Sequence, residues 1–411
     1  MELMQGYKQT ELGIIPTDWE ILKLGELFEF KNGLNKEKKY FGHGTPIINY
    51  MDVFRSRGIY SEQLLGKVFL SRSEINAYGA KKGDIFFTRT SETVNEIGIS
   101  SVLLDESIDT VFSGFVLRGR EKFVRLNNDY KKYCFSEPNV RSQIVSTASY
   151  TTRALTNGRL LSQVLIKIPP LPEQTAIANA LSDIDALISQ TEMLIEKKKA
   201  IKQGAMQELL KPKDGWVTKK LGEIIHLQGG YAFKSEQFTE VGVPIIRISD
   251  VGNNEVKTEN SVCYKEFNIP PEFVARKGDT LIAMSGATTG KVGVYNHSKI
   301  AYINQRVGKF IVINKNSTSN EFISHIVRSE KFKDNLSKQI AQGAQPNISG
   351  KQIESIEMSI PNNYQTQVII ASILSDIDKS IAFLELKLNK LKQQKQGMMQ
   401  TLLTGKIRLV S

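Results

Sequence analysis

The most constraining feature of this sequence is a long internal repeat. The letters Leu-Ser-Asp-Ile-Asp at 181–185 return at 374–378, and the offset of 193 residues holds without a gap from Gln174 to Leu210. About half of the residues paired by this offset are identical. The units of solenoid proteins run ~20–50 residues, so a unit of this length indicates a duplicated domain. We therefore predict a molecule with a pseudo-two-fold axis.

The duplication extends through the rest of the chain. The offset between repeated anchors varies from 195 to 198 residues, so the two copies share a scaffold while their loops differ in length. Short apolar segments, such as 280–283, predict strands, and 129–146 and 320–339 carry helical spacing. We therefore predict that each copy is a mixed α/β (α+β) lobe of roughly 150 residues. The anchors are Trp19, Gly33 and 82–84 in the first copy, and Trp216, Gly230 and 277–279 in the second.

Each copy ends in a predicted long helix with a heptad seam. Seam positions recur at alternating steps of three and four residues for about four heptads, which is typical of a coiled coil. Each helix follows a proline-marked stretch and should be about 35 residues, or roughly 50 Å, long. We expect the two helices to pair antiparallel within the chain; the alternatives are that each packs only on its own lobe or pairs between chains. The seam residues are Leu181, Ile184, Ile188 and Ile195 in the first helix and Leu374, Ile377, Ile381, Leu384, Leu388 and Leu391 in the second.

The repeat and the helices divide the chain into four parts. We place the first lobe at 1–167, the first long helix at 168–212, the second lobe at 213–359 and the second long helix at 360–411. Proteins with two-fold symmetry often recognise two half-sites on a two-fold polymer, of which DNA is the common one.

The charge balance favours a polyanionic partner. Lys and Arg outnumber Asp and Glu by 54 to 43, which gives a net charge of +11 and an isoelectric point of about 9.3. Such a surplus favours nucleic acid or an anionic membrane. No run approaches ~18 apolar residues and the first residues lack an apolar signal segment, so we expect no membrane partner. Cys134 and Cys263 lie far apart in the sequence and form no metal-ligand spacing, so a reducing cytoplasm is the expected compartment.

No pattern of residues predicts catalysis. Residues 286–291 resemble a phosphate-binding loop but are one residue short of the G-x-x-x-x-G-K spacing and lack the following Ser or Thr. The four histidines form no metal-ligand pair and no catalytic triad is apparent. We therefore predict a non-catalytic chain that binds no metal and no cofactor itself.

Two loop regions in each lobe carry the residue types that contact DNA. Arg, Lys, Asn, Gln and Thr on loops or helix ends are the side chains that hydrogen-bond base edges and phosphates. Glycines in the same loops allow close approach of the backbone to a phosphate. For any one residue, an ordinary surface turn is the competing interpretation. The candidates are Thr88, Arg89, Thr90, Ser91, Thr151, Thr152 and Arg153 in the first lobe, and Ser285, Thr288, Thr289, Lys291, Gln345 and Asn347 in the second.

Several segments resemble the specificity subunit of type I restriction-modification systems. Residues 7–19 look like the usual opening of that family, and 168–174 match its junction between domain and helix closely. Residues 285–291 resemble a turn of its target domain and 402–408 its usual ending. The second junction, 360–367, departs from the family pattern because it lacks the proline-glutamate-glutamine form. The resemblance spans nearly the whole chain.

The resemblance implies a function in a larger complex. Each lobe would be a target-recognition domain, and the two helices would be the spacer between them. The chain would bind double-stranded DNA and two modification subunits, which supply S-adenosylmethionine and methylate adenine. Restriction subunits would add translocation and cleavage with ATP and Mg²⁺. The target would be bipartite, with a non-specific gap whose length the helices set.

Two other classes of function compete with this interpretation. One is an adaptor whose coiled coil joins two protein-binding lobes, and the other is an enzyme with an unrecognised site. The basic charge argues against the adaptor and the missing catalytic pattern against the enzyme. Binding to duplex DNA that weakens steeply with salt would separate the DNA reader from the adaptor.

Overall fold

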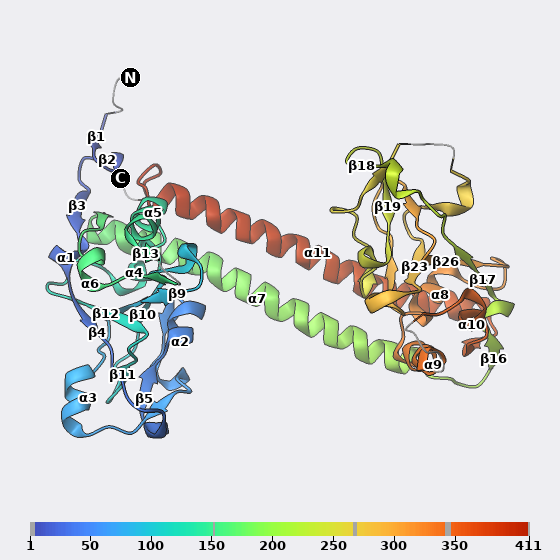
Figure 1. Ribbon diagram of the computed structural model, residues 1–411, viewed down its shortest axis with the longest axis horizontal. Helices are drawn as coiled ribbons and strands as arrows, with labels where there is room; N and C mark the ends of the chain where they lie inside the picture. The colour runs from blue at the N-terminus through green and yellow to red at the C-terminus, as the bar shows by residue number, and fades with distance from the viewer. Residues whose placement is uncertain (1–4, 151–152, 266–268, 342–346, 410–411) are drawn as a thin grey trace. The chain divides into compact units, whose positions relative to one another are not determined.

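The computed structural model describes residues 5–150, 153–265, 269–341 and 347–409 (Figure 1). The chain forms two compact units. Unit 1 comprises Met1–Glu192 and Lys387–Ser411, and unit 2 comprises Met193–Leu386. Each unit therefore contains one lobe together with a segment of each long helix.

Unit 1 is built around a five-stranded sheet of order β4-β12-β8-β10-β6, in which β6 and β10 are parallel and the other neighbours antiparallel. The unit also contains smaller sheets of order β11-β5-β7, β13-β14-β9, β15-β3 and β1-β2. The strands are β1 (Tyr7–Thr10), β2 (Gly13–Pro16), β3 (Glu20–Lys23), β4 (Phe28–Asn32), β5 (Phe41–Ile48), β6 (Gly58–Ile59), β7 (Lys67–Val68), β8 (Ile85–Thr88), β9 (Thr90–Ser91), β10 (Ser100–Leu103), β11 (Val111–Phe112), β12 (Val116–Glu121), β13 (Ser149–Tyr150), β14 (Ala154–Leu155) and β15 (Leu165–Ile168). The helices of the lobe are α1 (Leu24–Leu27), α2 (Tyr50–Arg55), α3 (Arg72–Tyr78), α4 (Asn128–Cys134), α5 (Pro138–Thr147) and α6 (Gly158–Leu161).

Unit 2 repeats this plan. Its sheet of order β17-β26-β23-β24-β20 has the same connectivity as the five-stranded sheet of unit 1, including the single parallel pair at one edge. A second sheet runs β18-β21-β19-β25-β22, and β16 pairs with β27. The strands are β16 (Trp216–Lys220), β17 (Ile225–Gly229), β18 (Phe238–Thr239), β19 (Val243–Ile246), β20 (Asn254–Glu255), β21 (Cys263–Tyr264), β22 (Val274–Ala275), β23 (Thr280–Ala283), β24 (Val292–Val294), β25 (Ala301–Ile303), β26 (Val307–Val312) and β27 (Glu357–Pro361). The helices of this lobe are α8 (Asn320–Ile326), α9 (Glu330–Ala341) and α10 (Gly350–Glu354).

The repeated glycines mark a close approach of two backbone segments in each lobe. A Cβ atom built on Gly33 would lie 2.1 Å from the carbonyl oxygen of Ser113, and one on Gly230 would lie 2.1 Å from that of Asn304. No other residue fits without moving backbone. The repeated Lys-Gly-Asp turn has an equally local cause, because Asp84 accepts a hydrogen bond from the backbone N–H of Lys81 at 2.8 Å.

The two long helices, α7 (Leu171–Leu209) and α11 (Tyr364–Leu402), each contain 39 residues. In unit 1 the side chain of Asp185 pairs with that of Lys395, and Glu192 pairs with Lys392 at 2.8 Å. In unit 2 Lys199 pairs with Glu385 at 3.4 Å and Lys202 with Asp378 at 2.5 Å. Within each unit the residue numbers rise on one helix as they fall on the other, so the predicted antiparallel pairing inside one chain is confirmed.

The helix ends belong to the cores of the lobes. The main core of the first lobe includes Trp19, residues 177, 178 and 181 of α7, Leu402 of α11 and the adjoining Leu403. In unit 2 the corresponding core includes Leu374 of α11, with Met206 of α7 packed against it. Among the seam residues, Ile188, Ile377 and Leu388 are partly exposed and the other seven are buried. None of the helices in the described part of the chain combines the length and apolar content needed to cross a membrane.

Candidate nucleic-acid interface

In the first lobe, the two predicted loop regions meet beyond the end of β8. Strand β9 pairs antiparallel with β14, which places Thr90 opposite Leu155. The backbone of Arg89 accepts a hydrogen bond from the N–H of Thr156 at 3.0 Å and donates one to the carbonyl of Phe115 at 3.2 Å. Three segments far apart in the sequence therefore converge at one end of the central sheet.

The candidate side chains at this place divide into buried and accessible sets. Thr88 is fully buried, and its hydroxyl accepts a hydrogen bond from the N–H of Ile99 at 2.9 Å and donates one to the carbonyl of Glu96 at 3.2 Å. Ser91 is buried, and its hydroxyl accepts from the N–H of Thr93 at 3.2 Å. Their hydroxyls are occupied inside the lobe. Arg89 and Thr90 are half-buried and Arg153 is exposed, so these three carry the DNA-contact hypothesis in this lobe.

The second lobe brings the equivalent segments together beyond β23. The N–H of Met284 donates to the carbonyl of Arg306 at 2.9 Å, and the N–H of Ile348 donates to the carbonyl of Met284 at the same distance. Ser285 is buried at the start of the short 3-10 helix Gly286–Thr288. The predicted turn at 285–291 and the predicted loop around Asn347 therefore lie side by side.

Here too some hydroxyls already have partners. The Thr288 hydroxyl donates to the carbonyl of Ile248 at 2.8 Å and that of Thr289 to the carbonyl of Gly286 at 2.7 Å. Lys291 is half-buried and Asn347 is exposed. The remaining candidates, Thr151, Thr152 and Gln345, lie outside the described residues.

In each lobe, one of the segments that lie together at the candidate site was not predicted from the sequence. Phe115 is 62% exposed, and Arg306 is exposed beside Met284. Both stand just before a strand of the central sheet, β12 in the first lobe and β26 in the second. The only signal for them in the sequence is their equivalent place in the repeat, because neither carries a motif of its own.

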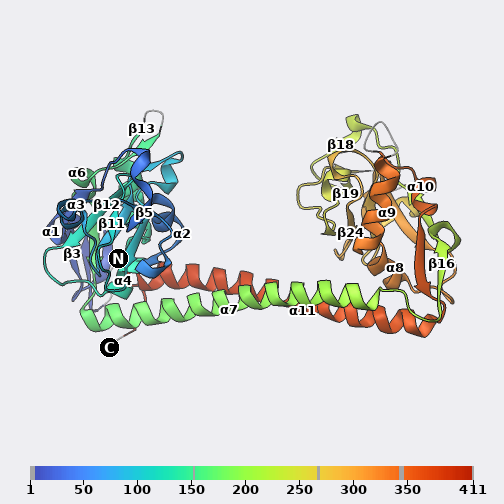
Figure 2. The same ribbon diagram turned by 90° about the horizontal axis from the view of Figure 1, so that it is seen from below.

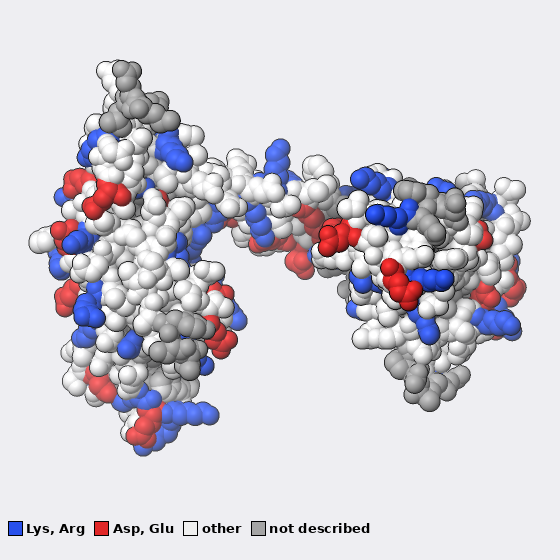
Figure 3. Space-filling view, turned by 45° about the horizontal axis from the view of Figure 1, so that its top comes forward, with Lys and Arg blue, Asp and Glu red and all other residues white. Residues whose placement is uncertain are grey.

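The basic surplus does not form one continuous patch on the face seen in Figure 3. Lys and Arg side chains there are interspersed with Asp and Glu. The charge therefore supports attraction to a polyanion without marking one binding surface, and the convergent loops are the more specific indication.

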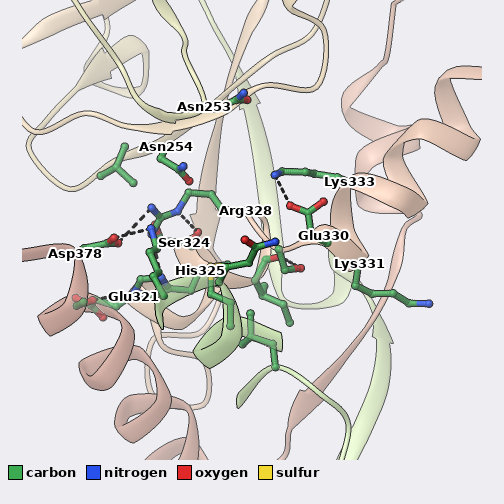
Figure 4. A pocket seen from close by; sticks show the side chains of 18 of the residues that line it. Asn253, Asn254, Glu321, Ser324, His325, Arg328, Glu330, Lys331, Lys333 and Asp378 are labelled. Carbon is green, nitrogen blue, oxygen red and sulfur yellow. Dashed lines mark hydrogen bonds and ion pairs between the residues drawn. The ribbon is translucent and has the colours of Figure 1, made fainter. Parts of the chain in front are cut away.

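A second notable place is a cleft of about 2180 Å³ in unit 2, lined by residues of both helices and of the lobe (Figure 4). At its wall the Nε2 atom of His325 lies 3.0 Å from the hydroxyl of Ser375, and Arg328 donates to Nδ1 at 3.0 Å. Since Nδ1 accepts, Nε2 carries the proton and donates to the serine. A histidine that activates a serine must instead accept its proton, so this pair is not arranged as nucleophile and base.

Burial, followed by the neighbouring Arg328, lowers the pKa of His325 to about 3, with Asp378 opposing and Lys202 adding to the shift. In the unfolded chain the imidazole of His325 has its ordinary pKa of about 6.5. Between the two pKa values the unfolded state therefore binds a proton that the folded state does not bind. Stability contributed by neutral His325 is present above pH ~6.5 and is lost as the pH falls toward 3. We expect the free energy of unfolding of unit 2 to fall by about 2 kcal/mol from this group between pH 7 and 5.

Urea unfolding of the wild type and of His325→Tyr at both pH values measures this effect. Tyrosine is the residue at the repeat-equivalent position, Tyr133, and does not titrate in this range. The variant should lose about 2 kcal/mol less than the wild type on acidification. Equal losses in the two proteins would contradict the assignment of a buried neutral histidine.

Comparison with known proteins agrees with the duplicated architecture. The model of the type I restriction modification DNA specificity domain matches twice, over 16–202 and 213–393. The type I restriction enzyme MjaVIII specificity subunit of Methanocaldococcus jannaschii is 26% identical over 99% of this chain and 98% of its own length. The putative MjaX specificity subunit of the same organism is 27% identical over 98% and 97%.

Solved structures show the same fold. The crystal structure of the type I restriction-modification S subunit from M. genitalium superposes with a TM-score of 0.61 at 16% identity, covering 98% of both chains. A structure described as the basis of complex assembly and conformational transition of the type I restriction-modification system gives 0.55 at 16% identity, covering 96% and 99%.

Proposed function

The chain belongs to the family of type I restriction-modification DNA specificity proteins, and from this premise we propose that it recognises a bipartite target in double-stranded DNA, one half-site per lobe. It is the non-catalytic specificity subunit of such a system. S-adenosylmethionine, ATP and Mg²⁺ would be bound by the modification and restriction subunits. The domain division 1–167, 168–212, 213–359 and 360–411 and a cytoplasmic location are part of the same proposal.

The observation that supports it most is the convergence of equivalent loops at the same end of two equivalent sheets. The positions are shared, whereas the accessible side chains differ: Arg89, Thr90 and Arg153 in one lobe, and Lys291, Arg306 and Asn347 in the other. Base edges are distinguished by the donors and acceptors of such side chains. Two lobes of one fold with different contact residues would recognise two different half-sites.

The long helices would set the gap between the half-sites. Each is a single uninterrupted helix, Leu171–Leu209 and Leu402 back to Tyr364, and each contributes residues to both units. A helix has a fixed rise per residue, so its length is a suitable measure of distance along a duplex.

The helix pair of unit 2 also offers a docking surface for a modification subunit. Leu194 and Ile201 are 43% and 47% exposed, and they directly precede Ile195 and Lys202, which are one heptad apart. The ion-pairing Lys199 directly follows Lys198, the heptad position between these two, so the apolar and ion-pairing residues flank the seam on opposite sides. Within each unit the lobe lies against one side of the helix pair (Figure 2), and ion-pairing residues such as Asp378 contact it there. The apolar flank is thus left uncovered by the lobe.

We expect Leu194→Glu together with Ile201→Glu to reduce co-purification of the modification subunit by about tenfold or more, because apolar contacts at the centre of an interface dominate its energy. Far-UV circular dichroism should be unchanged, since both side chains are exposed. Gln203→Glu, an exposed change on the other flank of the same helix, is the matched control. Undiminished co-purification of the double variant would remove this surface from the proposal.

The test of the function is a methylome. The chain is co-expressed with its modification subunit and methyladenine is mapped across the host genome. A single split motif that disappears when this chain is omitted is the expected result. An assembled, active complex that yields no new motif would overturn the proposal and favour an adaptor with two protein-binding lobes.

A further inference from the structure

Residues that recur in both long helices form two polar contact sites with the lobes, one in each unit, which we call junctions. In unit 1, the Tyr133 hydroxyl at the end of α4 donates to a carboxylate oxygen of Asp185 at 2.9 Å and lies 3.1 Å from the Ser182 hydroxyl. The other carboxylate oxygen of Asp185 pairs with Lys395 of α11. The junction therefore joins the lobe, its own helix and the partner helix through one carboxylate.

Unit 2 contains the equivalent junction. His325 at the end of α8 donates to the Ser375 hydroxyl at 3.0 Å, and Lys202 of α7 pairs with Asp378 of α11 at 2.5 Å. Arg328 adds a lobe contact to the same carboxylate at 3.5 Å (Figure 4). Again one aspartate connects the lobe with both helices.

Three of the residues that are repeated between the two long helices take part in these junctions. Ser182, Asp185 and Lys202 recur as Ser375, Asp378 and Lys395 at the offset of 193 residues. They are the serine and second aspartate of the Leu-Ser-Asp-Ile-Asp segment, and the lysine that begins Lys-Gln-Gly at 202–204 and again at 395–397. The side chains of Lys202 and Lys395 are only 14% and 17% exposed, unlike the surface ion pairs elsewhere on the helices.

The other contacts between lobe and helix include hydrogen bonds to a single long helix, in which Glu173 accepts from Trp19 and Gln367 from Ser319, and apolar packing through residues such as Leu181 and Leu374. Apolar contacts have little directional preference, whereas hydrogen bonds to a charged group are short and angle-dependent. We propose that Asp185 with Lys395, and Asp378 with Lys202, are positioning residues that fix the angle at which each lobe is presented, and hence the register in which the half-sites are read. This inference rests on the proposed function.

The helices supply a matched control within unit 1. Lys392 pairs with Glu192 at 2.8 Å, three residues before Lys395, and both side chains are about half exposed. No described lobe residue forms an ion pair or a side-chain hydrogen bond with either of them. Lys392→Asp and Lys395→Asp therefore make the same chemical change on the same helix, and only the second breaks a junction.

The test compares methylomes of complexes assembled with wild-type chain, Lys395→Asp, Lys392→Asp and the exchange Asp185→Lys with Lys395→Asp. In Lys395→Asp, methylation at the native gap should fall on the order of 100-fold, as for a misplacement of about 1 Å. Sites with a gap one base pair longer or shorter should gain methylation, while both half-sites stay the same. The exchange should restore the native gap, and Lys392→Asp should keep it.

The same exchange at Lys202 and Asp378 should fail to restore the gap, because the new lysine would face Arg328. A uniform loss of methylation with an unchanged gap distribution in Lys395→Asp would overturn the inference, since it would show a role in stability alone. Should that variant not assemble, Tyr133→Phe, which removes a single hydroxyl, decides the question by the same gap distribution. A wild-type complex without a split motif would instead refute the proposed function.

Discussion

Replacing Leu384 by aspartate should separate the two long helices in unit 2 and abolish recognition of the split target. Leu384 is 9% exposed at a seam position of α11. The change removes a buried leucine and leaves a charge without a partner in the seam, which together cost roughly 3–5 kcal/mol. Urea unfolding followed by far-UV circular dichroism measures the loss, and the methylome of the assembled complex measures recognition.

Ala382→Asp is the control for this prediction. It places the same side chain at an exposed position two residues earlier, where the cost is the lower helix propensity of aspartate, under ~1 kcal/mol. Equal stability of Leu384→Asp and Ala382→Asp would show that the seam is not a packed interface. Retained reading of the split target by Leu384→Asp would show that recognition does not need paired helices.

The architecture was predictable because its signals are local or periodic. The heptad seam lies in every turn of each helix, so α7 and α11 could be recognised without tertiary information. The anchors also have local causes: Gly33 lies where a Cβ atom would collide with backbone, and Asp84 closes its own turn. Duplication then supplied the second lobe from the first.

The interruptions of the shorter helices were less predictable. Helical spacing continues from 320 to 339, yet α8 ends at Ile326 and α9 starts at Glu330. The hydroxyl of Ser329 accepts a hydrogen bond from the N–H of Phe332 at 3.2 Å and so begins a new helix. Periodicity reports the buried face, which both helices share, and is insensitive to such a cap.

The candidate site likewise combines features that the sequence predicts with features that it does not. Residue types selected Arg89, Thr90 and Arg153 together with Thr88 and Ser91, and could not separate the accessible side chains from the buried ones. Ser91 is buried because β9 pairs with β14, a strand more than sixty residues later in the chain. Thr88 is buried because it ends β8 inside the central sheet, opposite Val116 of β12. Neither contact leaves a trace in the local sequence. Phe115 and Arg306 were missed for the converse reason, since only the fold brings them beside the predicted loops.

Lengthening both helices should change the gap in the target and leave the half-sites the same. We expect four residues inserted after Glu196 in α7 and after Lys387 in α11 to lengthen the gap by about two base pairs. Four residues advance a helix by ~6 Å, or about 1.8 base pairs, and rotate it by about 40° beyond a full turn. The duplex turns by about 60° over the same distance, so lobe and half-site stay in phase to within about 20°. The methylome gives the new gap directly.

Seven inserted residues provide the discriminating comparison. A whole heptad preserves the seam, so the helices should pair at least as well as with four. The insertion advances them by ~10.5 Å, or about three base pairs, over which the duplex turns by about 105° while the seam returns to nearly the same face. The half-site then faces away from its lobe, and methylation should be lost from a complex that still assembles.

Four residues inserted in α7 alone should also abolish methylation. The insertion moves Lys202 away from Asp185, so the ion pair of Asp185 with Lys395 and that of Lys202 with Asp378 would require different registers of α11. An unchanged gap in the variant with four residues inserted in both helices would mean that the helices do not set the gap. Activity of the seven-residue variant at a gap three base pairs longer would mean that helix length alone, and not rotational phase, decides which targets the two lobes can recognise.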